Sequence, residues 1–117
     1  MDGRAYWIER ATANVFSDPS IFKQYESLLN QLRPTKPRKL SRNSVRLSAT
    51  HEIKLLVWKD NGKIRGTRGS RKTLVGTTSL YSIFHDSGPY GVVENVVVDK
   101  KYRRLGIGRE LMARVIK

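Results

Sequence analysis

Two glycines near the C-terminus, Gly106 and Gly108, follow the pair Arg103 and Arg104 in a pattern that could bind an anion. Residues 91–98 before them are rich in valine, which predicts a strand, and the residues after them have helical spacing. The first N–H groups of a helix have no internal acceptor, and the helix dipole places about half a positive charge there. Glycines let a bulky ligand approach the backbone, and arginines add charge. Strand, glycine loop and helix N-terminus in this order predict a phosphate site.

Two familiar phosphate-binding motifs do not fit this loop. A Walker A loop would place Lys and then Ser or Thr after its last glycine, but Gly108 is followed by Arg109 and Glu110. A dinucleotide-binding fingerprint would need a third glycine where Leu111 stands and an acidic residue about twenty positions later, beyond Lys117. Neither motif is present.

The remaining pattern, Arg103-x-x-Gly106-x-Gly108 directly after a valine-rich strand, resembles motif A of the GNAT superfamily of acetyl-CoA-dependent N-acetyltransferases. A longer pattern, residues 94–112, also contains in register Glu94, Tyr102, Leu111 and Met112. This pattern resembles the family branch that includes the glucosamine-6-phosphate N-acetyltransferases and many small bacterial members. This resemblance implies an α/β fold, the GNAT fold, in which helices flank a mixed, mostly antiparallel sheet. It also implies N-acetyltransferase activity, acetyl-CoA as co-substrate and an amine acceptor.

The resemblance implies where acetyl-CoA would bind. Pantetheine would pair with the end of the strand, and the diphosphate would lie on the backbone N–H groups of the glycine loop. The expected cofactor-binding residues are Val96, Val97, Val98, Arg103, Arg104, Leu105, Gly106, Ile107, Gly108 and Arg109. Glu94, the one acid in the strand, aligns with a family carboxylate that binds the acceptor or relays its proton, so we expect it to be catalytic. A purely structural or substrate-positioning carboxylate is the alternative.

The composition limits the classes of partner. Lys+Arg 23 against Asp+Glu 10 gives a formal net charge of +13, which favours phosphate-bearing partners such as coenzyme A and leaves non-specific contact with nucleic acid open. No apolar run approaches the ~20 residues of a membrane span, so we expect a cytoplasmic protein without membrane contact. The sequence has no cysteine, and His51 and His85 lack further ligands at metal spacing, so no metal site is predicted.

The first part of the chain predicts a strand, a helix and a basic segment. Residues 6–11 indicate the strand, and Asp18-Pro19 followed by apolar residues of helical period predicts a helix that ends before Pro34. Residues 33–46 carry six basic side chains, two prolines and no acid, which predicts a loop or a loosely attached short helix. By analogy with the family, this segment could shape a pocket for an acidic or phosphorylated acceptor.

A hairpin is expected in the middle of the chain. Residues 53–58 and 73–84 read as strands, and Lys59-Asp60-Asn61-Gly62 is a typical turn sequence. Residues 63–72 would then form a long basic tip, whose charge comes from Arg65, Arg68, Arg71 and Lys72.

The order of elements matches the GNAT order up to motif A, which predicts a single domain over residues 1–117 that lacks the C-terminal strand and helix of the family, known as motif B. The helical spacing places four side chains against the sheet: Leu105, Met112, Val115 and Ile116. Without a fifth strand the Glu94 strand would expose an edge, so we expect a homodimer through that edge or a marginally stable chain with weak activity. An inactive relative that binds a polyanion or a protein is the alternative function.

Overall fold

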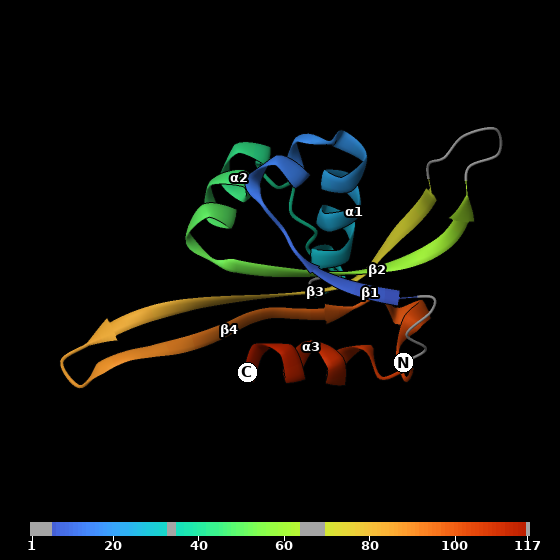
Figure 1. Ribbon diagram of the computed structural model, residues 1–117. Helices are drawn as coiled ribbons and strands as arrows, with labels where there is room; N and C mark the ends of the chain where they lie inside the picture. The colour runs from blue at the N-terminus through green and yellow to red at the C-terminus, as the bar shows by residue number, and fades with distance from the viewer. Residues whose placement is uncertain (1–5, 33–34, 64–69, 117) are drawn as a thin grey trace.

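The computed structural model describes residues 6–32, 35–63 and 70–116, and in this part of the chain a four-stranded sheet lies between helices on both faces (Figure 1). The strand order is β1 (Tyr6–Arg10), β2 (Ile53–Lys63), β3 (Ser70–His85) and β4 (Gly88–Val98). Each neighbouring pair is antiparallel. The expected α/β architecture is confirmed, and the described strands are antiparallel throughout.

The first helix follows its sequence signals. After the 3-10 turn η1 (Ala13–Ser17), α1 (Pro19–Asn30) begins with proline at its first position. The side chain of Asp18 accepts a hydrogen bond of 2.9 Å from the Ser20 N–H, so it caps the helix. Tyr25 and Leu28 of the apolar stripe are buried against the sheet.

The basic segment was only partly predicted. Residues 35–41 do form a loop, but α2 (Arg42–His51) is a regular helix, with Ser41 as its N-cap. Val45 and Ala49, four residues apart, are buried in the core, so α2 is packed rather than loosely attached. Arg33 of the basic segment lies outside the described residues.

The position of the hairpin turn was predicted wrongly. β2 continues through Asp60-Asn61-Gly62 to Lys63, and its register with β3 shifts between Asp60 and Lys63. Gly62 has φ +91°, its N–H bonds to the Asp60 carboxylate at 2.8 Å, and the Asn61 amide donates to Thr73 of β3. These residues therefore form a bulge within the paired strands. Arg71 and Lys72 lie in β3, whereas the predicted tip residues Arg65 and Arg68 lie outside the described residues.

The sheet has one core on each face. On the α1 and α2 side, Leu56, Trp58 and Val97 pack with Phe16 and other helix residues. On the opposite side, Val57 and Val75 pack with residues of α3 (Ile107–Ile116). Figure 1 shows α3 on that side, beneath β3 and β4.

The side of α3 that faces the sheet differs from the prediction. Ile107 and Leu111 are fully buried, and Met112 and Val115 are half-buried. Leu105 is 45% exposed, because it precedes the helix and its direction does not follow helical spacing. The side chain of Ile116 lies outside the described residues.

Candidate functional site

β4 carries a bulge directly before the predicted site. Glu94 pairs with Ser79 and Val97 pairs with Thr77, so two residues of β4 face one residue of β3. Asn95, the first residue of the bulge, has φ +54°. β4 is the edge strand of the described sheet, and Val96 is 40% exposed beside that edge. Whether a second chain pairs there stays a prediction.

The turn after β4 is fixed by Asp99. Its N–H donates to the Val75 carbonyl at 2.8 Å, and its carboxylate accepts from the Lys101 N–H at 2.9 Å, which caps the short 3-10 helix η2 (Lys100–Tyr102). The Arg103 Nε–H then donates to the Val98 carbonyl at 3.1 Å. These bonds fix the loop next to the end of β4.

Two left-handed residues turn the chain into α3. Arg104 has φ +66° and Gly106 has φ +84°. The Gly106 carbonyl accepts the Glu110 N–H at 3.1 Å, so Gly106 occupies the N-cap position before Ile107. The N–H groups of the first turn of α3 therefore have no acceptor within the helix.

A groove of about 560 Å³ lies between the end of β4 and the start of α3. It brings together nine of the ten predicted cofactor-binding residues: Val96, Val97, Val98, Arg103, Arg104, Gly106, Ile107, Gly108 and Arg109. Leu105 does not line it. Leu32 and Tyr102 do, and neither was predicted as a site residue; Tyr102 belongs to the quoted motif, but Leu32 reaches the groove only through tertiary packing.

The groove has the chemistry that a phosphorylated, partly apolar ligand needs. Valine side chains and backbone of β4 form one end, and three exposed guanidinium groups lie around the helix N-terminus at the other. A Cβ added to Gly108 would lie 3.8 Å from Val98 Cγ2, an ordinary contact, so packing alone does not require glycine there. A glycine at the mouth of the groove instead keeps the backbone accessible to a ligand.

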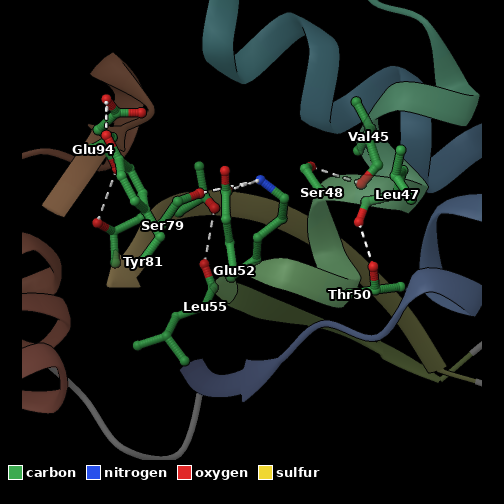
Figure 2. A network of polar contacts seen from close by, with 12 residues as sticks. Val45, Leu47, Ser48, Thr50, Glu52, Leu55, Ser79, Tyr81 and Glu94 are labelled. Carbon is green, nitrogen blue, oxygen red and sulfur yellow. Dashed lines mark hydrogen bonds and ion pairs between the residues drawn. The ribbon is translucent and has the colours of Figure 1, made fainter. Parts of the chain in front are cut away.

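Glu94 does not line this groove and lies on the α1 and α2 side of the sheet. Its cross-strand partner Ser79 contacts Lys54 beneath α1, and directly paired residues share a face. The Tyr81 hydroxyl donates to Glu94 Oε1 at 2.9 Å, as Figure 2 shows. That bond to the carboxylate, with burial and the negative charge of Glu94 as further causes, raises the pKa of Tyr81 above its ordinary value. Tyr81 therefore remains a donor to Glu94 at neutral pH.

Two further observations limit the chemistry of the described residues. In that part of the chain no group of three or more His, Cys, Asp or Glu side chains is placed to hold a metal ion. None of the described helices has the length and apolar character to cross a membrane.

A sequence model of the acetyltransferase (GNAT) family matches residues 19–117. Among curated protein sequences, none matches this chain significantly. The fold is nevertheless shared with solved structures at low sequence identity. An aminoglycoside acetyltransferase from an uncultured soil metagenomic sample has a TM-score of 0.72 at 16% identity, over 99% of this chain and 70% of that one.

Two other similar structures come from a plant and a bacterium. Glucosamine-6-phosphate N-acetyltransferase from Arabidopsis thaliana gives a TM-score of 0.64 at 17% identity, over 95% of this chain and 71% of that one. A GNAT family acetyltransferase from Staphylococcus aureus gives 0.65 at 14% identity, over 96% and 76%. At these identities the likeness establishes the fold alone.

Proposed function

This chain belongs to the GNAT family of acetyltransferases, and we propose that it transfers the acetyl group of acetyl-CoA to a primary amine. The observation that carries the proposal is the groove at the N-terminus of α3, where backbone N–H groups and three arginines surround a glycine loop. Members of the family typically use acetyl-CoA. Two of the similar structures are named as acetyltransferases of aminoglycosides and of glucosamine 6-phosphate, which agrees with an amine acceptor.

Acetyl-CoA is the substrate that we propose for the groove. Its diphosphate would accept hydrogen bonds from the N–H groups of residues 104–109, each charge-assisted bond contributing roughly 1.5 to 3 kcal/mol. The guanidinium groups of Arg103, Arg104 and Arg109 would balance the phosphate charge. The pantetheine arm would run along the open edge of β4, where Val96, Val97 and Val98 offer backbone hydrogen bonds.

The transfer itself needs a neutral amine and a stabilised oxyanion. An alkyl ammonium group has a pKa of about 10, so it must lose a proton before its nitrogen attacks the thioester carbonyl. Glu94, directly or through a water molecule, is the proposed acceptor of that proton. The N–H groups near Val96 are proposed to hold the oxyanion. The C–S bond then breaks, and the coenzyme leaves as a thiolate that takes up the second proton lost by the attacking nitrogen.

Calorimetric titration with acetyl-CoA and with dephospho-CoA tests the binding site, and release of free thiol with a panel of primary amines tests the transfer. We expect acetyl-CoA to bind and the Gly108→Asp variant to bind it more weakly, because a carboxylate would stand among the phosphates. If Gly108→Asp binds acetyl-CoA as tightly as the parent does, the groove is not the acetyl-CoA site. Binding without thiol release for any amine would instead favour an inactive relative that binds polyanions.

A further inference from the structure

A second pocket lies on the α1 and α2 side of the sheet, beside the bulge of β4. It has a volume of about 280 Å³, close to the lower end of the ~300 Å³ range typical of small-ligand sites. Leu29 and Leu40 contribute apolar surface, and Ser44 and Ser48 of α2 contribute hydroxyl groups. Asn95, the left-handed bulge residue, lines its β4 side.

This pocket lies near the groove of α3. A smaller hollow of about 180 Å³ lies between them and shares Leu29, Leu40 and Asn95 with the pocket. The same hollow shares Leu32 with the groove. The three hollows are therefore neighbours along the same side of β4.

Among the described residues that line the pocket, Lys54 is the one cation, and all its donors are occupied. Lys54 is only 4% exposed, and its ammonium group bonds to Glu52 at 3.0 Å, to the Ser79 hydroxyl at 3.2 Å and to the Tyr25 hydroxyl at 3.3 Å. An ammonium group has three N–H donors, so none remains for a ligand. Lys54 instead holds the carboxylate of Glu52 in place at the pocket.

The pocket offers both acceptors and donors: Glu52 and Ser48 accept, and the Ser41 and Ser44 hydroxyl groups and the Asn95 amide also donate. Among the described residues no donor reaches the second oxygen of Glu52, whose side chain is 26% exposed. The Ser48 hydroxyl donates to the Val45 carbonyl at 2.9 Å, which leaves its lone pairs for a ligand. Because Lys54 offsets the charge of Glu52, the pocket attracts neither a phosphate nor a second ammonium group strongly.

We propose that this pocket holds the body of the acceptor, and that the acceptor is an amine bearing several hydroxyl groups, as an amino sugar does. Its hydroxyl groups would donate to Glu52 and Ser48, its carbon skeleton would rest on the leucines, and its amine would point toward Val96. The inference rests on the proposed acetyl transfer. It differs from the acidic or phosphorylated acceptor that the basic segment suggested, because Lys54, the cation among the described residues that line this pocket, is already paired.

The test compares glucosamine with cyclohexylamine, a ring of the same size without hydroxyl groups, in the parent and in Ser48→Ala. Thr50→Ala is the matched control, because the Thr50 hydroxyl makes the same type of bond within α2, to Leu47, but does not line the pocket (Figure 2). We expect Ser48→Ala to lower kcat/KM for glucosamine about three- to tenfold, the effect of one hydrogen bond, and to leave cyclohexylamine unchanged. Thr50→Ala should change neither.

The comparison between variants cancels the different basicities of the two amines. An equal effect of Ser48→Ala on both amines would overturn the proposal, as would an equally large effect of Thr50→Ala. If no amine is acetylated, calorimetric binding of the two amines to the coenzyme A complex gives the same comparison without turnover. If glucosamine binds, Ser48→Ala weakens that binding and no acetyl group is transferred, the proposed function is rejected but the proposed pocket is supported. If glucosamine does not bind, the proposed pocket is rejected.

Discussion

Gly76 of β3 lies directly beneath Ile107, the first residue of α3: a Cβ built on Gly76 would stand 3.2 Å from Ile107 Cγ2. It would also stand 3.4 Å from Val57 Cγ2 and 3.5 Å from Leu111 Cδ1. A missing side chain in the sheet therefore lets the helix N-terminus sit close to β3 and the end of β4. The position of the candidate phosphate site depends on this contact.

Replacing Gly76 with valine should lower the free energy of unfolding by about 1 to 3 kcal/mol, the usual cost of overpacking a core. The control is Gly91→Val in β4, where an added Cβ would meet a single atom, the movable end of Leu80 at 3.2 Å. Denaturant unfolding of both variants measures the difference. Equal losses for the two would show that α3 tolerates a side chain at Gly76.

Gly108→Ala should lower the affinity for acetyl-CoA without changing the stability of the fold. The added Cβ would make an ordinary 3.8 Å contact with Val98, so we expect the melting temperature to stay close to that of the parent. Affinity for acetyl-CoA should fall, because a methyl group would stand between the ligand and the backbone. Thermal melts measure the melting temperature, and calorimetry measures the affinity for acetyl-CoA. Unchanged affinity would mean that the diphosphate does not approach this position.

Arg104→Gly should raise the stability of the fold and lower the affinity for acetyl-CoA. A residue other than glycine in the left-handed region costs about 1 to 2 kcal/mol, and the greater freedom of glycine in the unfolded chain offsets roughly 0.5 to 1 kcal/mol of the relief. With φ +66° at Arg104, we expect a net gain of about 0.5 to 1 kcal/mol in the free energy of unfolding, and weaker acetyl-CoA binding because a charge is lost.

The control for that substitution is Arg103→Gly, at a residue with φ −70°. It should weaken acetyl-CoA binding too, but it should lower stability, because its bond to the Val98 carbonyl is lost and no strain is relieved. Stabilisation by both substitutions would refute the role assigned to backbone strain.

The residues that line the groove could be grouped from the sequence because they lie close together in it; their binding of acetyl-CoA stays a prediction. The valines, the arginines and the glycines all lie within residues 96–109. Their mutual placement is set by the strand, the left-handed turn and the helix N-terminus. Leu105 was the exception. It stands between two left-handed residues, so a helical period counted through it has no meaning.

Features set by strand pairing could not be predicted in the same way. Asp60-Asn61-Gly62 can form a turn or a bulge, and a bond from Asn61 to Thr73, twelve residues away, favours the bulge. The bonds of Lys54 to Tyr25 and Ser79 span 29 and 25 residues. Tyr81 likewise meets Glu94 only through the register of β3 with β4.

The bond between Tyr81 and Glu94 should make stability depend on alkaline pH. An unfolded tyrosine ionises near pH 10, and the folded protein holds the Tyr81 proton more tightly because its pKa is raised. The contribution of this bond to the free energy of unfolding is therefore complete below about pH 10, and it is lost as the pH rises through the pKa of Tyr81 in the folded protein. Between about pH 9 and 11, the parent should lose more stability than Tyr81→Phe, in which the other tyrosines are the same.

Glu94→Gln provides a second check on the same pair. It replaces the carboxylate, whose hydrogen bond is the main cause of the raised Tyr81 pKa and whose charge adds to it, with a neutral amide. The parent's additional loss of stability at alkaline pH should therefore become smaller. Thermal melts at several pH values measure this. If Glu94→Gln follows the parent curve instead, the hydrogen bond to the carboxylate does not control the ionisation of Tyr81.

The same substitution tests the proposed role of Glu94 in catalysis. Because Glu94 does not line the groove of α3, Glu94→Gln should leave the dissociation constant of acetyl-CoA unchanged while it lowers kcat for amine acetylation. Tyr81→Phe should lower kcat less, since it removes only a bond that orients the carboxylate, and should have no further effect in the Glu94→Gln background. Steady-state kinetics of the two single variants and the double variant decide the matter. A fully active Glu94→Gln variant would exclude Glu94 as the base, and loss of acetyl-CoA binding alone would assign it a structural role.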